Sequence, residues 1–170
     1  MVRLPGSEAD ERGAWQYEGI MMSDPVRGVT VLTLLRCNSQ TQVLCEILHS
    51  RCIRFHNRET LAEARTLLHR EPPDLVICER NLTDGADWKD VLTEIEFTRG
   101  LQPLIVISRL ADDAFWAEVL NLGGFDVLVQ PFDPSEVARI IAYASEESRD
   151  KRACRRSATK HMSATAAGCR

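Results

Sequence analysis

The sequence predicts an α/β fold built on a single doubly wound, five-stranded parallel sheet with the strand order 2-1-3-4-5. Strand-like runs alternate with amphipathic helical patterns five times between residues 28 and 146. Some of these runs are apolar at every position, which is typical of parallel strands buried on both faces. Right-handed crossovers leave few topologies for such an alternation, and this strand order is the natural choice for five strands.

The first half of the pattern contains two strand-helix units. Residues Val29–Leu35 are rich in β-branched residues, which favours a strand, and Asn38 or Ser39 is placed to cap the following helix. Residues Cys52–Phe55 predict the second strand. Asn57 is expected to cap the second helix.

The second half contains the remaining three units. Strands are expected at Leu75–Cys78, Leu104–Ile107 and Asp126–Val129, and a helical pattern follows each of them. The last helix has the clearest start signal, because Asp133 stands at the cap and Glu136 follows three residues later, with proline at the first helical position. We expect this helix to fray near Ser148.

Composition divides the chain into three parts. Residues 1–27 show no periodicity and are expected to form a flexible N-terminal arm, residues 28–146 form the folded domain, and residues 147–170 form a flexible basic tail. The formal net charge is −4, but the tail has seven basic and two acidic residues and so carries +5. The rest of the chain is therefore acidic, which argues against a nucleic-acid-binding surface.

Several classes of function are excluded by what the sequence lacks. No apolar run is long enough to span a bilayer, and the six cysteines contain no CxxC pair that would indicate zinc. Without a secretion signal, the cysteines are expected to be reduced thiols in the cytoplasm. The sequence has no GxGxxG, Walker A or GxSxG motif, so we do not expect an enzyme.

Three segments carry a resemblance to a known family. They are PDLVICE at Pro73–Glu79, PLIVIS at Pro103–Ser108 and GGFDVLVQPF at Gly123–Phe132. This set resembles the patterns PDLVxxD, PxIxxT/S and GAxDxxxKPF of the receiver domain of bacterial response regulators. The resemblance covers residues 28–146 and implies a flavodoxin-like receiver fold and a role in two-component, or phosphorelay, signal transduction.

Receivers use a defined set of side chains, which this chain keeps only in part. In the family, two acids after strand 1 and an aspartate after strand 3 bind Mg²⁺, and a hydroxyl and a lysine hold the phosphoryl oxygens. Here the position of the phosphoacceptor holds Glu79. The rest of the degenerate pocket is expected at Leu35, Arg36, Ser108, Gln130 and Pro131, and the switch positions correspond to Ser108 and Val127.

The joint loss of both acids, the aspartate and the lysine indicates a pseudoreceiver, with no cofactor and no bound Mg²⁺. In one interpretation, Arg36 takes the place of the metal and pairs with Glu79, which Ser108 would also hold, so that the pocket mimics the phosphorylated state. In the other, Arg36 points into solvent. The resemblance also implies a cis peptide bond between Gln130 and Pro131.

The resemblance implies protein partners, namely a sensor histidine kinase, another regulator or an effector. The short apolar runs and the net charge argue against a membrane and against nucleic acid as partners. Phe115 and Trp116 are candidate interface residues on the fourth helix, because adjacent helical positions cannot both face the core. A homodimer through the fourth helix, fifth strand and fifth helix is one form of that contact. Two alternatives stay open: a flavodoxin-like small-molecule binder that uses the loop Asn38–Thr41, and phosphotransfer with Glu79 as the acceptor.

Overall fold

A computed structural model describes residues 15–17, 20–22, 28–98, 102–110 and 112–166. Most of the predicted N-terminal arm, residues 1–27, lies outside these ranges. Within the arm, two short strands, β1 (Trp15–Tyr17) and β2 (Ile20–Met22), pair antiparallel. The sequence pattern had not indicated these two strands, and the flexibility of the arm stays a prediction.

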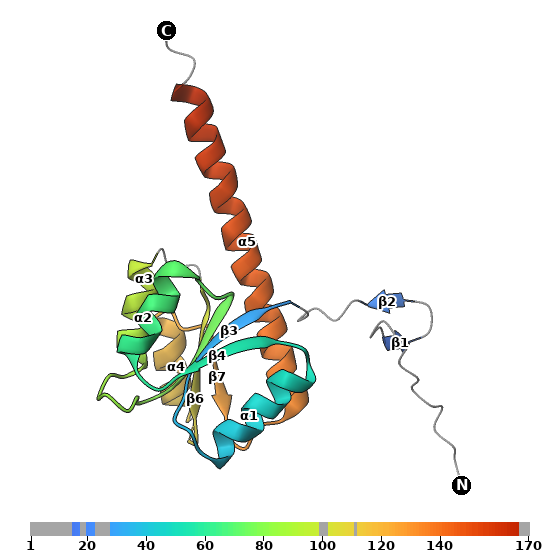
Figure 1. Ribbon diagram of the computed structural model, residues 1–170, viewed down its shortest axis with the longest axis vertical. Helices are drawn as coiled ribbons and strands as arrows, with labels where there is room; N and C mark the ends of the chain where they lie inside the picture. The colour runs from blue at the N-terminus through green and yellow to red at the C-terminus, as the bar shows by residue number, and fades with distance from the viewer. Residues whose placement is uncertain (1–14, 18–19, 23–27, 99–101, 111, 167–170) are drawn as a thin grey trace.

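The domain is built on five parallel strands in the order β4-β3-β5-β6-β7 (Figure 1). These strands are β3 (Thr30–Leu34), β4 (Arg54–Arg58), β5 (Leu75–Glu79), β6 (Leu104–Ser108) and β7 (Asp126–Val129). Counted along the sheet, this is the predicted order 2-1-3-4-5, which confirms the fold class.

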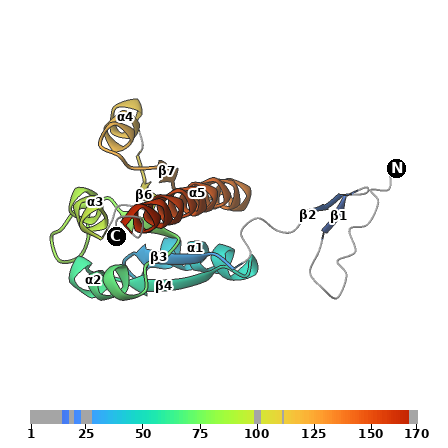
Figure 2. The same ribbon diagram turned by 90° about the horizontal axis from the view of Figure 1, so that it is seen from above.

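Helices cover both faces of the sheet, in two separate hydrophobic clusters (Figure 2). On one face lie α1 (Ser39–Ser50) and the first half of α5 (Pro134–Ala166), and on the other lie α2 (Leu61–Arg70), α3 (Trp88–Phe97) and α4 (Asp113–Asn121). Alternate residues of each strand supply the two clusters: Ile77 packs beneath α1 and α5, whereas Val76 and Cys78 pack beneath the other three helices.

Of the three capping residues predicted for helix starts, two are confirmed and one is wrong. Asn38 caps α1 by accepting hydrogen bonds from the backbone of the first turn, and Asp133 does the same at the start of α5. The cap of α2 is Thr60, so the prediction of Asn57 is wrong. Asn57 belongs to β4, where its side chain bonds across to Thr33 of β3 at 3.0 Å and to the carbonyl of Leu35 at 3.2 Å.

Helix α5 does not fray near Ser148 but continues to Ala166, and it extends away from the domain (Figure 1). Ser148 is fully buried, and one turn later Arg152 bonds to Asp74 Oδ1 at 3.0 Å and to the carbonyl oxygen of Pro73. These contacts join the second half of the helix to the sheet, which the helical pattern alone did not reveal. Residues 147–166 of the predicted basic tail are thus helical, and residues 167–170 lie outside the described ranges.

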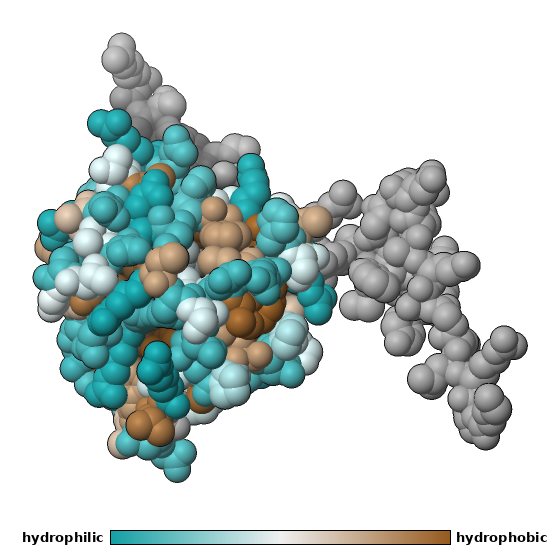
Figure 3. Space-filling model, turned by 60° about the horizontal axis from the view of Figure 1, so that its bottom comes forward, coloured by the Kyte–Doolittle hydropathy of each residue, from teal (hydrophilic) through white to brown (hydrophobic). Residues whose placement is uncertain are grey.

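No helix in the described ranges has both the length and the apolar character that crossing a bilayer requires. On the face drawn in Figure 3, hydrophilic side chains cover most of the described surface, and hydrophobic side chains form small groups among them.

Candidate functional site

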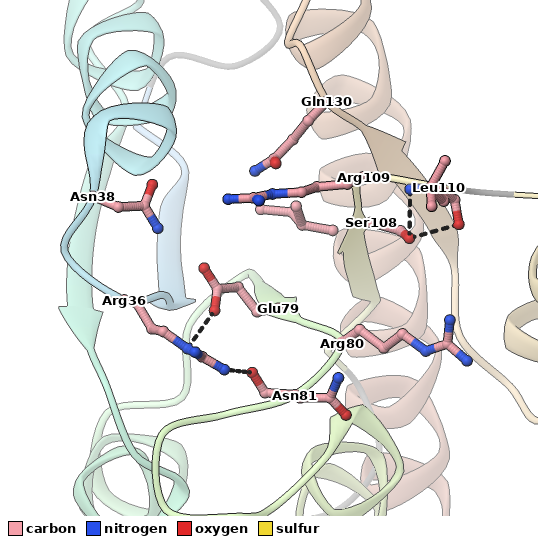
Figure 4. Close-up of a pocket in the computed structure, with 10 residues that line it drawn as sticks. Arg36, Asn38, Glu79, Arg80, Asn81, Ser108, Arg109, Leu110 and Gln130 are labelled. Atoms are coloured by element: carbon pink, nitrogen blue, oxygen red, sulfur yellow. Dashed lines mark hydrogen bonds and ion pairs between the residues drawn. The ribbon is translucent and has the colours of Figure 1, made fainter.

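The carboxyl ends of the parallel strands meet at one edge of the sheet, and a cavity of about 430 Å³ opens there. Ligand sites in doubly wound sheets form at this edge, since neighbouring loops diverge to opposite faces. The lining combines the predicted positions 36, 79, 108 and 130 with residues from the loops after β3, β5 and β6 (Figure 4). The cavity is lined by Arg36, Asn38, Glu79, Arg80, Asn81, Ile107, Ser108, Arg109, Leu110 and Gln130.

Arg36 and Glu79 face each other across the floor of this cavity. Arg36 follows β3 by two residues, and its Nε lies 3.3 Å from Glu79 Oε2 (Figure 4). Its terminal nitrogen also donates to the carbonyl oxygen of Asn81, at 3.1 Å. Of the two interpretations of Arg36, the structure therefore has the one in which it pairs with Glu79. The guanidinium joins the loop after β3 to the loop after β5.

The surroundings of Glu79 act on its charge in opposite directions. Only 18% of its side chain is exposed, and burial raises the pKa of the carboxyl above its ordinary value. The charge and backbone N–H of Arg36, the charge of Arg109 and a hydrogen bond from Asn38 partly offset this effect on the pKa. The ionised carboxylate therefore depends on the arginines and the amide beside it.

Ser108 lines the cavity but uses its hydroxyl elsewhere. The hydroxyl donates to the carbonyl oxygen of Leu110 at 2.9 Å and accepts from the backbone nitrogen of the same residue at 3.3 Å (Figure 4). The expected contact of Ser108 with Glu79 is absent from the described residues. Ser108 instead fixes the first turn of the loop after β6.

Two of the predicted pocket residues lie outside the cavity lining. The Leu35 side chain is buried in the cluster beneath α1 and α5, because the end of β3 turns it toward the core. Pro131 is exposed beyond the cavity and follows the expected cis peptide bond. Gln130 does reach the cavity, with its amide directed into it (Figure 4). Val127, at the aromatic switch position, is buried in the cluster that includes α4.

Sequence reasoning did not assign four of the polar lining residues to the cavity: Asn38, Arg80, Asn81 and Arg109. Arg80 and Arg109 each stand directly after the last residue of a strand, and Arg36 stands two residues after one. That recurrence, an arginine at three strand ends that share one edge, is the signal that could have found them. Asn38 was recognised only as a helix cap. The guanidinium carbon of Arg80 lies 4.2 Å from the centre of the Phe115 ring, at the margin of the cavity.

The two candidate interface aromatics are both held against the domain. Phe115 is only 4% exposed and meets Trp88 edge to face, with the ring centres 6.3 Å apart. Trp116 is half-buried, and its indole nitrogen donates to Asp126 Oδ1 at 3.1 Å. Phe115 thus belongs to the core and Trp116 lies at its edge, and a role of either residue in an interface stays a prediction. Leu120 of this helix is a large apolar side chain that is exposed.

The residues of this cavity do not fit a magnesium ion. Mg²⁺ is usually held by carboxylates and water in octahedral geometry, whereas the cavity lining contains one carboxylate, Glu79, which is already paired with Arg36. In the described part of the chain, no three histidine, cysteine, aspartate or glutamate side chains gather in a way that could hold a metal ion.

Comparisons with known proteins identify the architecture. A scan against family models and a search of curated proteins give no match, but solved structures do match. The signal receiver domain of a Luxo repressor protein from Vibrio parahaemolyticus is 17% identical, with a TM-score of 0.66 over 74% of this chain and 96% of that chain. A beryllofluoride-activated NtrC4 receiver domain dimer is 22% identical, with a TM-score of 0.63 over 70% and 98%.

A third similar structure is the receiver domain of a sensor histidine kinase from Pseudomonas aeruginosa, which holds a magnesium ion in its active-site cleft. It is 21% identical, with a TM-score of 0.62 over 70% of this chain and 98% of that chain. All three matches cover nearly the whole of the other domain. The architecture built from β3 to α5 is therefore the receiver fold of response regulators, as the three sequence segments indicated.

Proposed function

We propose that this chain is a receiver-like module of two-component signalling that acts by protein contact, without phosphorylation of its pocket. The observation that carries the proposal is the Arg36–Glu79 pair, in which a guanidinium lies 3.3 Å from the residue at the phosphoacceptor position. A fixed positive charge there takes the role that a metal ion has in the family. The module is in this sense a pseudoreceiver of the bacterial cytoplasm, and not an enzyme.

The contacts of Arg36 give this proposal a physical basis. Glutamate is one methylene longer than aspartate, so its carboxylate reaches further into the cavity than the usual acceptor. Arg36 binds that carboxylate and the carbonyl of Asn81 together, which holds two loops of the carboxyl edge in one arrangement. The surface that a partner meets is then set by the sequence itself, instead of by a reversible modification.

Partners of the module are other proteins of the pathway: a sensor histidine kinase, a second regulator or an effector. A homodimer through α4, β7 and α5 is one form of this contact, and a dimer is the form of the NtrC4 receiver domain. Exposed apolar side chains on these helices, Leu120 of α4 and Tyr143 of α5, support that surface.

The first test asks whether Glu79 accepts a phosphoryl group. The protein is incubated with acetyl phosphate and Mg²⁺, and its intact mass is measured. We expect an unchanged mass, because Arg36 occupies the carboxylate and the metal ligands are missing. A stable adduct of ~80 Da, the mass of one phosphoryl group, that disappears in Glu79→Gln would overturn the proposal in favour of phosphotransfer.

The second test asks whether the pair governs contact with partners. Wild type, Arg36→Ala and Glu79→Ala are used as baits in a native lysate, and Arg70→Gln, at the far end of α2, is the matched control. A captured signalling protein that is lost from both pair variants and kept by the control supports the proposal. Equal capture by all four proteins would contradict it.

The flavodoxin-like alternative receives less support from the loop that motivated it. Asn38 accepts from the backbone nitrogens of Gln40 and Thr41, at 2.9 and 3.0 Å, and the Thr41 hydroxyl donates to the carbonyl of Arg36 at 2.6 Å. These groups cap α1 and fix the loop, so they are not free to hold a flavin phosphate. A flavin absorption band in the purified protein is the observation that would restore this alternative.

A further inference from the structure

The cavity at the carboxyl edge has the opposite charge from one that holds a metal. Three arginines, Arg36, Arg80 and Arg109, line it against one carboxylate, that of Glu79. Guanidinium groups bind carboxylate and phosphate groups through paired N–H donors, whereas a cation needs oxygen ligands. The balance of charge therefore favours an anion.

The three arginines differ in what already engages them. Arg36 is bonded to Glu79 and Asn81, and Arg80 lies against the ring of Phe115. Arg109 lies near enough to Glu79 to influence its charge, but no hydrogen bond or ion pair joins it to another residue in the part of the chain that the structure describes. Its guanidinium extends across the cavity (Figure 4).

A second donor points into the same space. The side-chain amide of Gln130, at the end of β7, is directed into the cavity beside Arg109, and among the described residues it has no hydrogen-bond partner (Figure 4). The cavity of about 430 Å³ lies within the range of sites that hold small molecules, roughly 300–1,000 Å³. Two uncommitted donors thus converge on a space that a small ligand can fill.

We propose that this cavity binds a small anion that carries a phosphate or carboxylate group, without a metal ion and without a covalent bond. Arg109 donates two N–H groups to the anion, and the Gln130 amide donates a third. Arg36 keeps Glu79 occupied, so that the carboxylate does not compete for Arg109. This inference goes beyond the proposed function, because it requires no protein partner.

The test is a titration of the full chain with inorganic phosphate, pyrophosphate and citrate, by isothermal calorimetry at constant ionic strength and without Mg²⁺. We expect saturable binding with one site for each chain. Tighter binding of the phosphates or of citrate tells which of the two groups the site prefers. Absence of saturable binding for all three anions would overturn the proposal.

Three variants, each with glutamine in place of the natural residue, make the test specific. Arg109→Gln removes the uncommitted guanidinium and should weaken binding by roughly ten-fold or more, as the loss of a charged hydrogen bond does. Glu79→Gln removes a negative charge and should tighten binding, whereas at a cation site the same change would weaken it. Arg70→Gln is the control, because the end of α2 lies at the opposite edge of the sheet, and it should leave the affinity unchanged.

Two results with these variants would contradict the proposal. Equal affinity of Arg109→Gln and wild type, or weaker binding by Glu79→Gln, would contradict it. Melting curves of the three variants confirm that each is folded before the titration. A negative result in the partner-capture experiment leaves these outcomes unaffected, so the two proposals can fail separately.

Discussion

An arginine faces a carboxylate at both edges of the sheet, and the two pairs differ in what surrounds them. At the amino edge, Arg152 bonds to Asp74 and to the carbonyl of Pro73, and the second carboxylate oxygen of Asp74 accepts from the backbone of Thr30 at 2.8 Å. At the carboxyl edge, the Arg36 side chain is 52% exposed and borders a cavity with uncommitted donors.

The difference between the two pairs separates a structural role from a functional one. In the Arg152–Asp74 pair both partners have several hydrogen bonds, and these join α5, the start of β5 and the start of β3. The Arg36–Glu79 pair joins only two loops and leaves polar groups unused around it. The side-chain N–H groups that line this cavity and bond to no other described residue do not contribute to the stability of the fold. A partner or ligand that accepts hydrogen bonds from them can therefore gain binding energy at the carboxyl edge.

The largest effect is expected at the amino edge. Asp74→Ala removes the acceptor for the Thr30 N–H and the partner of Arg152, and it should lower the free energy of unfolding by about 2 kcal/mol. Urea denaturation measures this change. Asp74→Asn, which keeps an acceptor oxygen, should lose less, and the exposed Asp150→Ala should change stability by less than about 0.5 kcal/mol. A loss for Asp74→Ala no larger than that of Asp150→Ala would remove the distinction between the edges.

A smaller effect is expected from the support beneath Arg36. Thr41→Val keeps the shape of a buried side chain but removes the hydroxyl that donates to the Arg36 carbonyl at 2.6 Å. We expect a loss of about 1 kcal/mol in the free energy of unfolding, together with weaker anion binding. Thr93→Val is the control, because its hydroxyl bonds within an exposed turn of α3. Matching losses in the two variants would show that Arg36 needs no such support.

The smallest effect at neutral pH is expected from the exposed pair itself. Arg36→Ala should cost less than about 1 kcal/mol, as is usual for exposed ion pairs. Its signature is the dependence on pH. Burial raises the pKa of Glu79 in the folded state, so its contribution to stability is fully present at low pH and is lost as the pH rises from the ordinary glutamate pKa through the raised one.

Removal of Arg36 takes away an influence that lowers the pKa of Glu79, so the loss of stability should continue to higher pH. Melting temperatures of wild type, Arg36→Ala and Glu79→Gln, measured from about pH 4 to pH 8, test this. The gap between Arg36→Ala and wild type should widen with rising pH, and Glu79→Gln should lack the glutamate-dependent loss. A gap that stays constant would mean that Arg36 does not act on Glu79.

Local signals in the sequence predicted much of the fold. The apolar strand runs, the cap at Asp133 and the cap at Asn38 depend on neighbours a few residues apart, and the structure contains all of them. The cap of α2 was misplaced because Asn57 makes its hydrogen bonds across the sheet, to residues more than twenty positions away. A cap motif and a cross-strand contact look the same in the sequence.

The site was predicted less completely, for the same physical reason. Positions 36, 79, 108 and 130 could be placed because they end or closely follow strands that share an edge. The free guanidinium of Arg109 becomes apparent only when three strand ends are assembled. The hydrogen bond of Trp116 to Asp126 and the contact of Arg152 with Asp74 likewise join side chains that no periodicity relates. The exposure of side chains such as Trp116 and Arg152 could not be predicted from the sequence, because it is set by these long-range contacts.

The length of α5 gives the Arg152–Asp74 contact a mechanical consequence. The helix continues for 14 residues beyond Arg152, to Ala166, which at 1.5 Å per residue is a rod of roughly 20 Å. An α-helix is stiff over that distance, so this part of α5 is a rigid rod that is anchored to the domain by Arg152 at its base. For a given small change in the angle of the rod at Arg152, the displacement of each residue grows with its distance from Arg152. A change in angle that leaves the packed core intact would therefore move the far end of α5 the most.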